Sequence, residues 1–225
     1  MKITYKYPVF RNRLHKIAAF SVLVVGITTS AFSEVTYNPD KNTWSGSGTY
    51  SETINVSGDT IFNCSAGNIT LTGPITGTGT IRHTGPANTL LLKSDLSGFT
   101  GTISNEINRW IEMYSVAGNS TTSGDTSMWD MSHISFTASH TQGFALASQI
   151  DVPTAIFAFG DMSTSNASTT IQSSSKSSTV TSTNAKSLII CEVGALNKNS
   201  TYAGKFEITA NTLSALIKSA LENGH

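Results

Sequence analysis

The sequence predicts an all-β protein in which short strands coil into a partial solenoid. Apolar residues alternate with threonine over a few positions, as Ile69 and Leu71 do around Thr70. Glycines and Gly-Pro pairs separate these segments at intervals of about ten residues. The hairpin-forming pair Asn-Gly occurs only at Asn223-Gly224. Single-glycine bends between stacked coils are therefore favoured over the hairpins of a sandwich.

The segment 1–33 has the features of a secretory signal peptide. Residues 1–16 include five basic residues and no acid, an apolar run follows at 17–27, and small residues occupy Ala31 and Ser33. The apolar run has about 11 residues, whereas a membrane span needs roughly 20. We expect cleavage after Ser33, which leaves 34–225; an uncleaved anchor is the alternative.

The charge of the mature segment argues against some partners. The chain has 14 basic and 14 acidic residues, and removal of five basic ones leaves 9 − 14 = −5. Nucleic-acid phosphates require clustered Lys and Arg, so no nucleic-acid partner is expected. Contact with a membrane is expected only through the export signal.

The strands are predicted in chain order from alternation and glycine spacing. They are expected at 49–50, 54–56, 61–62, 69–71, 80–81, 90–92, 99–103, 155–160 and 188–191. The segment 155–160 is apolar on both faces, which predicts a strand buried on two sides. The Ser/Thr-rich segment 162–187 is either a solvated loop or a polar outer wall.

The tail shows a different periodicity. Apolar residues recur with helical spacing at Leu213, Leu216, Ile217, Ala220 and Leu221. We therefore expect a β-domain over 34–210 and a short C-terminal helix over 211–225. This helix would cover the exposed strand edges at the end of the solenoid.

The block 67–103 resembles the autotransporter-associated β-strand repeat. The matching positions are Gly77, Gly79, Ile81, Gly85, Leu90, Leu92, Phe99, Gly101 and Ile103. A partial second copy comprises Leu188, Ile190, Gly194, Leu196, Tyr202, Gly204 and Phe206, and SGFTGTI (97–103) parallels STYAGKF (200–206). The resemblance covers about 37 residues well and about 19 more loosely.

This resemblance implies a right-handed parallel β-helix that is carried outside the cell as an autotransporter passenger. Passengers of this family are followed by a membrane domain, whereas a helical pattern precedes His225 here. A truncated passenger, a fragment and a free secreted relative all remain open.

No catalytic, cofactor-binding or metal-binding residue is predicted. Glu106 and Glu112, six apart, could share a strand face, and the remaining candidate carboxylates are Asp125, Asp130, Asp151 and Asp161. His133 and His140 are seven apart and would lie on opposite faces of a continuous strand, so they would not share a metal. No Gly-x-Ser-x-Gly motif marks a serine nucleophile.

Two further groups have two interpretations each. Trp44, Trp110 and Trp129 form either a binding patch or core and cap packing. Cys64 and Cys191 are either a disulfide or two separate thiols.

The function expected from these patterns is that of an exported, non-enzymatic surface or extracellular module for adhesion or display. The irregular segment 104–160 would contact a host or matrix glycan or protein. The alternatives are a carbohydrate-active β-helix enzyme, with carboxylates near Arg82 or Arg109, and an inactive truncated passenger.

Overall fold

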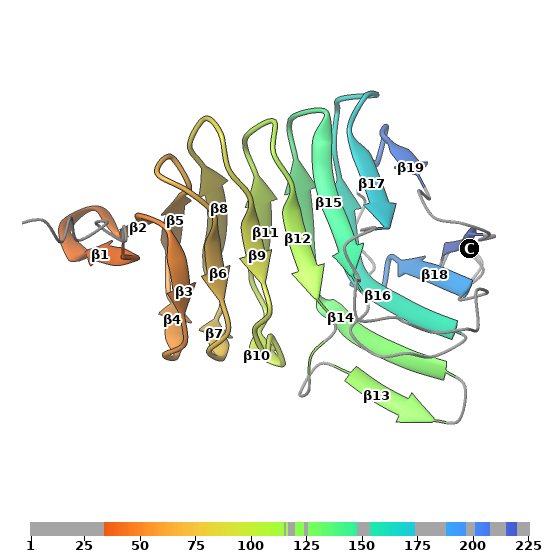
Figure 1. Cartoon of the computed structure of the whole chain (residues 1–225). Coiled ribbons are helices and arrows are strands. Elements are labelled where there is room, and N and C mark those ends of the chain that lie inside the picture. Colours follow the sequence, from red (N-terminus) through yellow and green to blue (C-terminus); the bar gives the residue numbers. More distant parts are fainter. Residues whose placement is uncertain are drawn as a thin grey trace, which may run out of the picture. The chain divides into compact units, whose positions relative to one another are not determined.

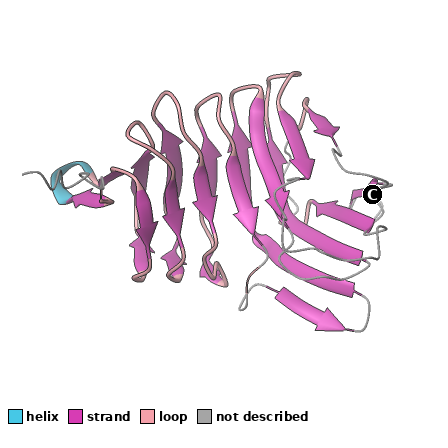
Figure 2. Cartoon of the chain, viewed as in Figure 1, coloured by secondary structure: helices cyan, strands magenta, loops and turns pink. Residues whose placement is uncertain are grey.

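The computed structural model describes residues 34–114, 116, 120–123, 126–147, 154–173, 188–196, 201–207 and 215–219. All of them belong to one compact unit, Ser33–His225. The described residues contain no α-helix, only a short 3-10 turn, η1, at Pro39–Lys41 (Figure 2). The prediction of an all-β protein is confirmed.

The strands form three sheets. Sheet A consists of β1 (Thr36–Asn38), β2 (Thr43–Ser45), β5 (Asp59–Asn63), β8 (Thr80–Thr84), β11 (Thr102–Asn105), β14 (Thr126–Ala138), β16 (Thr154–Ser163), β18 (Leu188–Val193) and β20 (Ala215–Ser219), with β13 (Ser120–Ser123) beside β14. Sheet B consists of β3 (Gly48–Tyr50), β6 (Ile69–Leu71), β9 (Leu90–Leu92), β12 (Ile111–Tyr114), β15 (Gln142–Ala147), β17 (Thr170–Ser173) and β19 (Lys205–Glu207). Sheet C consists of β4 (Ile54–Val56), β7 (Ile75–Gly77) and β10 (Gly98–Phe99).

The chain visits these sheets in rotation. From β2 to β11, successive strands lie in sheets A, B and C and then return to A (Figure 1). Strands in the interior of a sheet pair in parallel with the strands one circuit earlier and one circuit later, as β5 does with β2 and β8. Among the described strands, the antiparallel pairs are β1 with β2 and β13 with β14. From β14 onward the strands alternate between sheets A and B.

Inward side chains of successive circuits lie in register and form one apolar core. Two inward columns are Ile81, Ile103, Phe136 and Met162 in sheet A, and Ile69, Leu90, Ile111, Phe144 and Ile171 in sheet B. None of these side chains is more than 2% exposed. Their burial is the main stabilising contribution, because it removes apolar surface from water in every circuit.

Glycines occupy the bend that precedes sheet A strands. The N–H of Thr80 donates to the Gly58 carbonyl and that of Thr102 to the Gly79 carbonyl, each at 3.0 Å. A Cβ atom at Gly101 would overlap the Gly79 carbonyl oxygen. The bends of adjacent circuits therefore approach too closely to admit a side chain there.

Three predicted strands have the observed bounds, since β4, β6 and β9 span 54–56, 69–71 and 90–92. The single strand predicted at 99–103 is wrong. The bend at Gly101 divides it, so that Phe99 ends β10 in sheet C and Ile103 lies in β11 in sheet A.

The strand predicted at 155–160 lies within β16. Phe157, Ala158, Phe159 and Gly160 are all buried, so the expectation of burial on both faces is confirmed for these four residues. Both edges of β16 are also paired, with β14 on one side and β18 on the other.

The predicted C-terminal helix is not seen. Ala215–Ser219 form strand β20, which pairs in parallel with β18, while 211–214 and 220–225 lie outside the described residues. Leu216 and Ile217 suit a strand as well as a helix. The edge of β18 offers N–H and C=O groups that a strand, unlike a helix, can pair with, and this pairing overrides the helical periodicity.

The two copies of the predicted repeat do not occupy equivalent places. Leu90 and Leu92 lie in β9 of sheet B, whereas Leu188 and Ile190 lie in β18 of sheet A. The sequence similarity between the copies therefore reflects the shared apolar alternation of a strand rather than one position in the circuit.

Candidate functional site

The outer side of sheet A carries two rows of mostly polar side chains, which we call the polar face. The strands β5, β8, β11, β14 and β16 each contribute two outward residues that flank an inward one. The first row is Asp59, Thr80, Thr102, Ser135 and Asp161, and the second is Ile61, Arg82, Ser104, Thr137 and Ser163. Because paired strands lie about 4.8 Å apart, the rows form a regular array.

An ion-pair network crosses this face. Arg82 Nε and Nη2 donate to the two carboxylate oxygens of Glu106 at 2.7 and 2.8 Å, and Nη1 donates to Asp59 Oδ2 at 3.3 Å. Ser104 Oγ donates to Glu106 Oε1 at 3.2 Å. The hydrogen bonds from Arg82 are the main reason that the pKa of Glu106 is lowered. Glu106 is thus an ionised carboxylate whose two oxygens are both occupied.

Asp161 closes the first row and differs from the other acids. Its side chain is only 8% exposed, and its Oδ1 atom has no hydrogen-bond partner within the described residues. Asp130 is exposed, and its Oδ1 accepts from the Ser132 N–H at 2.9 Å. The candidates Asp125 and Asp151 lie outside the described residues.

Glu112 belongs to a separate cluster on sheet B. It lies in β12, whereas Glu106 follows β11 of sheet A, so the expectation that these two share a strand face is wrong. Tyr114 Oη donates to Glu112 Oε2 at 2.9 Å, and Lys93 Nζ lies 4.5 Å from the Tyr114 ring centroid. Burial, followed by the nearby carboxylate, raises the pKa of Tyr114 to about 12. This phenol stays protonated and acts as a hydrogen-bond donor.

The cysteines offer no reactive thiol in the described part of the chain. Cys64 is a free, fully buried thiol. Burial raises the pKa of Cys64 to about 12, so the reactive thiolate is scarce at neutral pH. The backbone of Cys191 lies in β18, and its side chain is outside the described part.

The candidate histidines lie apart. His133 lies in β14 with its Nε2 atom 3.1 Å from the Leu96 carbonyl oxygen, and His140 lies beyond the end of that strand at Ala138. In the portion of the chain that the structure describes, no group of three or more His, Cys, Asp or Glu side chains is arranged to hold a metal ion.

The three tryptophans do not form one patch. Trp44 packs against Tyr37, Tyr50 and Phe62 at the β1 end of sheet A, and Trp129, 1% exposed, packs edge-on against Phe157. Core and end packing therefore accounts for both.

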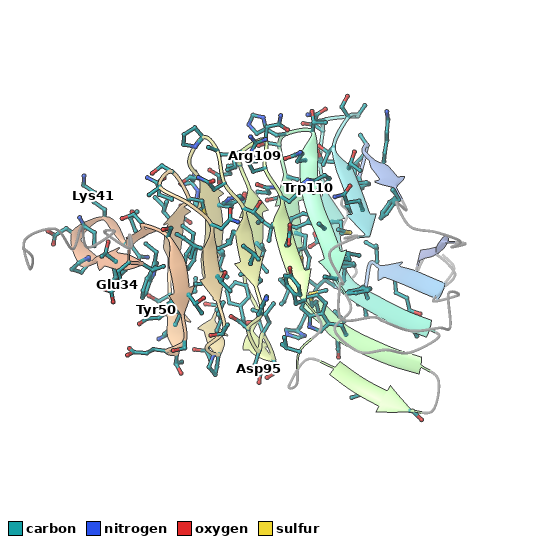
Figure 3. All side chains as sticks on the ribbon, viewed as in Figure 1. Glu34, Lys41, Tyr50, Asp95, Arg109 and Trp110 are labelled. Atoms are coloured by element: carbon teal, nitrogen blue, oxygen red, sulfur yellow. The ribbon has the colours of Figure 1, made fainter. Side chains whose placement is uncertain are left out.

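Trp110 and Arg109 lie on another part of the molecule, well separated from Tyr50 (Figure 3). Arg109 Nε donates to the Ala87 carbonyl at 2.7 Å, and among the described residues no carboxylate forms an ion pair with it.

The polar face includes Ser104, Ser135 and Thr137 from the predicted contact segment 104–160 and adds strands on either side of it. Sequence reasoning did not single out the face, because each strand contributes only two of its residues. The available signal was the recurrence of a polar residue directly after a bend glycine, as at Gly58-Asp59, Gly79-Thr80 and Gly101-Thr102.

Comparison with family models, curated proteins and solved structures shows no match to this chain. Within the described residues, no helix has the length and apolar character needed to cross a membrane.

Proposed function

We propose that this protein is an exported, non-enzymatic module for adhesion or display, built as a right-handed parallel β-helix. The observation that carries the proposal is the rotation of successive strands through sheets A, B and C, with parallel pairing one circuit apart. In a β-helix each coil stacks on the next and presents a continuous outer wall. The resemblance to the autotransporter-associated repeat implies the same arrangement.

The polar face, apart from its buried members Ser135 and Asp161, is the contact surface in this proposal. Its hydroxyl groups donate and accept hydrogen bonds, which suits the hydroxyl and amide groups of a host or matrix glycan or protein. The side chains stand on paired strands above a filled core, so little conformational freedom is lost when a partner binds. A partner that contacts several strands would make many weak interactions, which together would give the binding affinity.

The second candidate is a carbohydrate-active enzyme, because Asp59 and Glu106 both bind Arg82 on one face. Most glycosidases need one carboxyl group that remains protonated and one that is free to act as base or nucleophile. The lowered pKa of Glu106 and its bidentate pairing with Arg82 favour adhesion over hydrolysis.

Export and binding can be tested together. Secretion from a bacterial host should yield a soluble product whose first residue is Glu34, as read by N-terminal sequencing. This product is then applied to arrays of glycans and matrix proteins. The double variant Thr102→Arg/Thr137→Arg places two bulky charges on the polar face and should weaken binding at least about tenfold.

Thr70→Arg is the matched control, because Thr70 is the outward residue of β6 on sheet B. It should bind like the wild type. Equal losses in both variants, or binding that neither changes, would exclude the polar face as the contact surface. Release of sugar from an arrayed glycan would instead support the enzyme.

A further inference from the structure

Tyr37 presents an aromatic ring to solvent at the N-terminal end of sheet A. Its side chain is 46% exposed, and it is the one large apolar side chain on the surface of the part of the chain that the structure describes. Its neighbours along β1, Thr36 and Asn38, are polar, and the exposed turn η1 follows with Asp40 and Lys41. Lys41 lies at this same end of the molecule (Figure 3). A single aromatic ring is therefore exposed among polar groups.

The ring is held in one orientation by contacts on its inner side. Its centroid lies 4.6 Å from that of the buried Trp44 ring, with 30° between the two planes. Tyr37 Oη donates to Asn42 Oδ1 at 2.8 Å. Asn42 is fixed in turn, because its Nδ2 atom donates to the Asp59 carbonyl oxygen at 2.6 Å and to Thr60 Oγ1 at 3.0 Å. A ligand on the exposed face of the ring would therefore cost this side chain little conformational entropy.

The size of this aromatic surface indicates which kind of partner fits it. Aromatic side chains have an area of about 150–250 Å², so the exposed part of Tyr37 amounts to about 100 Å². A stable protein–protein interface takes about 800 Å² from each partner. The exposed ring is a small part of such an interface, whereas its area is comparable with that of one sugar ring.

We propose that Tyr37 binds one pyranose ring of a neutral glycan by stacking against its C–H face. A sugar with equatorial hydroxyl groups carries C–H bonds on the faces of its ring and hydroxyl groups around the rim. The phenol ring supplies an apolar surface for such a face. In the turn that follows, Asp40 can accept and Lys41 can donate hydrogen bonds to the rim hydroxyl groups. Because this turn carries one acidic and one basic residue, a neutral sugar is favoured over a charged one.

This site is independent of the polar face. Tyr37 lies in β1, whereas the polar face begins at β5, so either surface could bind a glycan when the other does not. A single stacked sugar makes few contacts, and we expect a Kd of about 1–10 mM.

Titration of the purified protein with cellohexaose, a soluble oligomer of β-linked glucose, tests this site by NMR spectroscopy. The wild type should show saturable binding. Tyr37→Ala should weaken this binding at least about tenfold, whereas Tyr37→Phe keeps the ring and should bind within about threefold of the wild type. Tyr37→Leu still covers Trp44 with an apolar side chain but has no aromatic face, so it should lose binding as Tyr37→Ala does.

Thr70→Arg, on the outer face of sheet B, is the control and should bind cellohexaose as the wild type does. Thermal unfolding shows whether each variant is folded, and Tyr37→Leu decides the matter if Tyr37→Ala is not. The absence of saturable binding by the wild type, equal losses in Tyr37→Phe and Tyr37→Ala, or undiminished binding in Tyr37→Leu would overturn the proposal. Binding that is lost in Thr102→Arg/Thr137→Arg but not in Tyr37→Ala would assign the glycan to the polar face and would also overturn it.

Discussion

His83 lies inside the core, where its two ring nitrogens face two oxygen atoms. Nδ1 is 3.0 Å from Asn105 Oδ1, and Nε2 is 3.0 Å from the Asn88 carbonyl oxygen. The Asn105 amide is held in this orientation because its Nδ2 donates to the carbonyls of Arg109 and Gly143, each at 2.7 Å. A neutral imidazole has one N–H and can satisfy only one of the two oxygens.

The stability of the protein should therefore depend on pH through His83. Burial is the larger effect and lowers the pKa of His83 to about 4 from its usual 6.5, against the opposing effect of the hydrogen bonds that the ring makes to the Asn105 and Asn88 oxygens. The associated stability is fully present above pH 6.5 and is lost as the pH falls toward 4. Between pH 7.5 and 5 we expect a loss of about 2 kcal/mol.

Denaturant unfolding at both pH values measures this loss. His83→Gln should show a pH dependence smaller than the wild type by about 2 kcal/mol. His140→Gln, which alters a residue of an exposed turn, is the control and should retain the wild-type dependence. An unchanged dependence in His83→Gln would contradict the assignment.

The bend glycines provide a second test at single residues. A Cβ at Gly101 would overlap the Gly79 carbonyl oxygen and lie 2.7 Å from the Phe99 ring, whereas a Cβ at Gly58 would meet nothing within 4 Å. Gly101→Ala should destabilise the protein by about 1–3 kcal/mol or more. Gly58→Ala should be neutral or stabilising by up to about 1 kcal/mol. Chemical denaturation measures the free energy of unfolding of both variants. Equal changes in the two would contradict the close approach of the backbone at Gly101.

At the scale of elements, β14 connects the regular circuits to the later ones. Its residues from Ser135 onward pair with β11, and its register against β16 shifts between Met131 and Ser135. Phe136 packs against Phe144 of β15 at a centroid distance of 5.4 Å and against Phe159 of β16 at 4.9 Å. This ring therefore links sheets A and B.

Removal of that ring should be among the most costly changes in this strand. Phe136→Ala leaves a cavity between the two sheets and should lower the free energy of unfolding by about 3–5 kcal/mol. Thr137→Ala, one residue along on the outer face, should change it by less than about 1 kcal/mol. Thermal and denaturant unfolding compare the two, and comparable losses would show that β14 does not have the inward and outward alternation described above.

The N-terminal end of sheet A is covered by an antiparallel strand and by aromatic rings. β1 turns back through η1 and pairs antiparallel with β2, with Tyr37 opposite Trp44. The rings of Trp44 and Tyr50, with centroids 4.4 Å apart, cover the core at this end. β1 has only three residues, and so short an edge strand offers few N–H and C=O groups to another strand.

At the scale of the whole molecule, parallel pairing joins strands of successive circuits, about 20 residues apart in the early part of the chain. Asp59 pairs with Thr80 and Thr80 with Thr102, so that each circuit contacts mainly its two neighbours. Stability is thus expected to accumulate circuit by circuit, as in other stacked repeats. The same spacing brings Asp59, Thr80, Thr102, Ser135 and Asp161 into one row, although 102 positions separate the first from the last (161 − 59).

The alternation at Ile69 and Leu71, and at Leu90 and Leu92, was sufficient to predict β6 and β9, because inward and outward orientation along a strand is a local property. Glycine spacing located the bends for the same reason. The apolar periodicity through Leu216 and Ile217 predicted a helix, and this was wrong. Adjacent apolar residues occur in helices and in strands, and the free edge of β18 decides in favour of a strand.

Only the tertiary structure shows which residues that are distant in the sequence pair with one another. The sheet to which each strand belongs, the division of 99–103 at Gly101, and the meeting of Arg82 with Asp59 and Glu106 all depend on residues more than 20 positions apart.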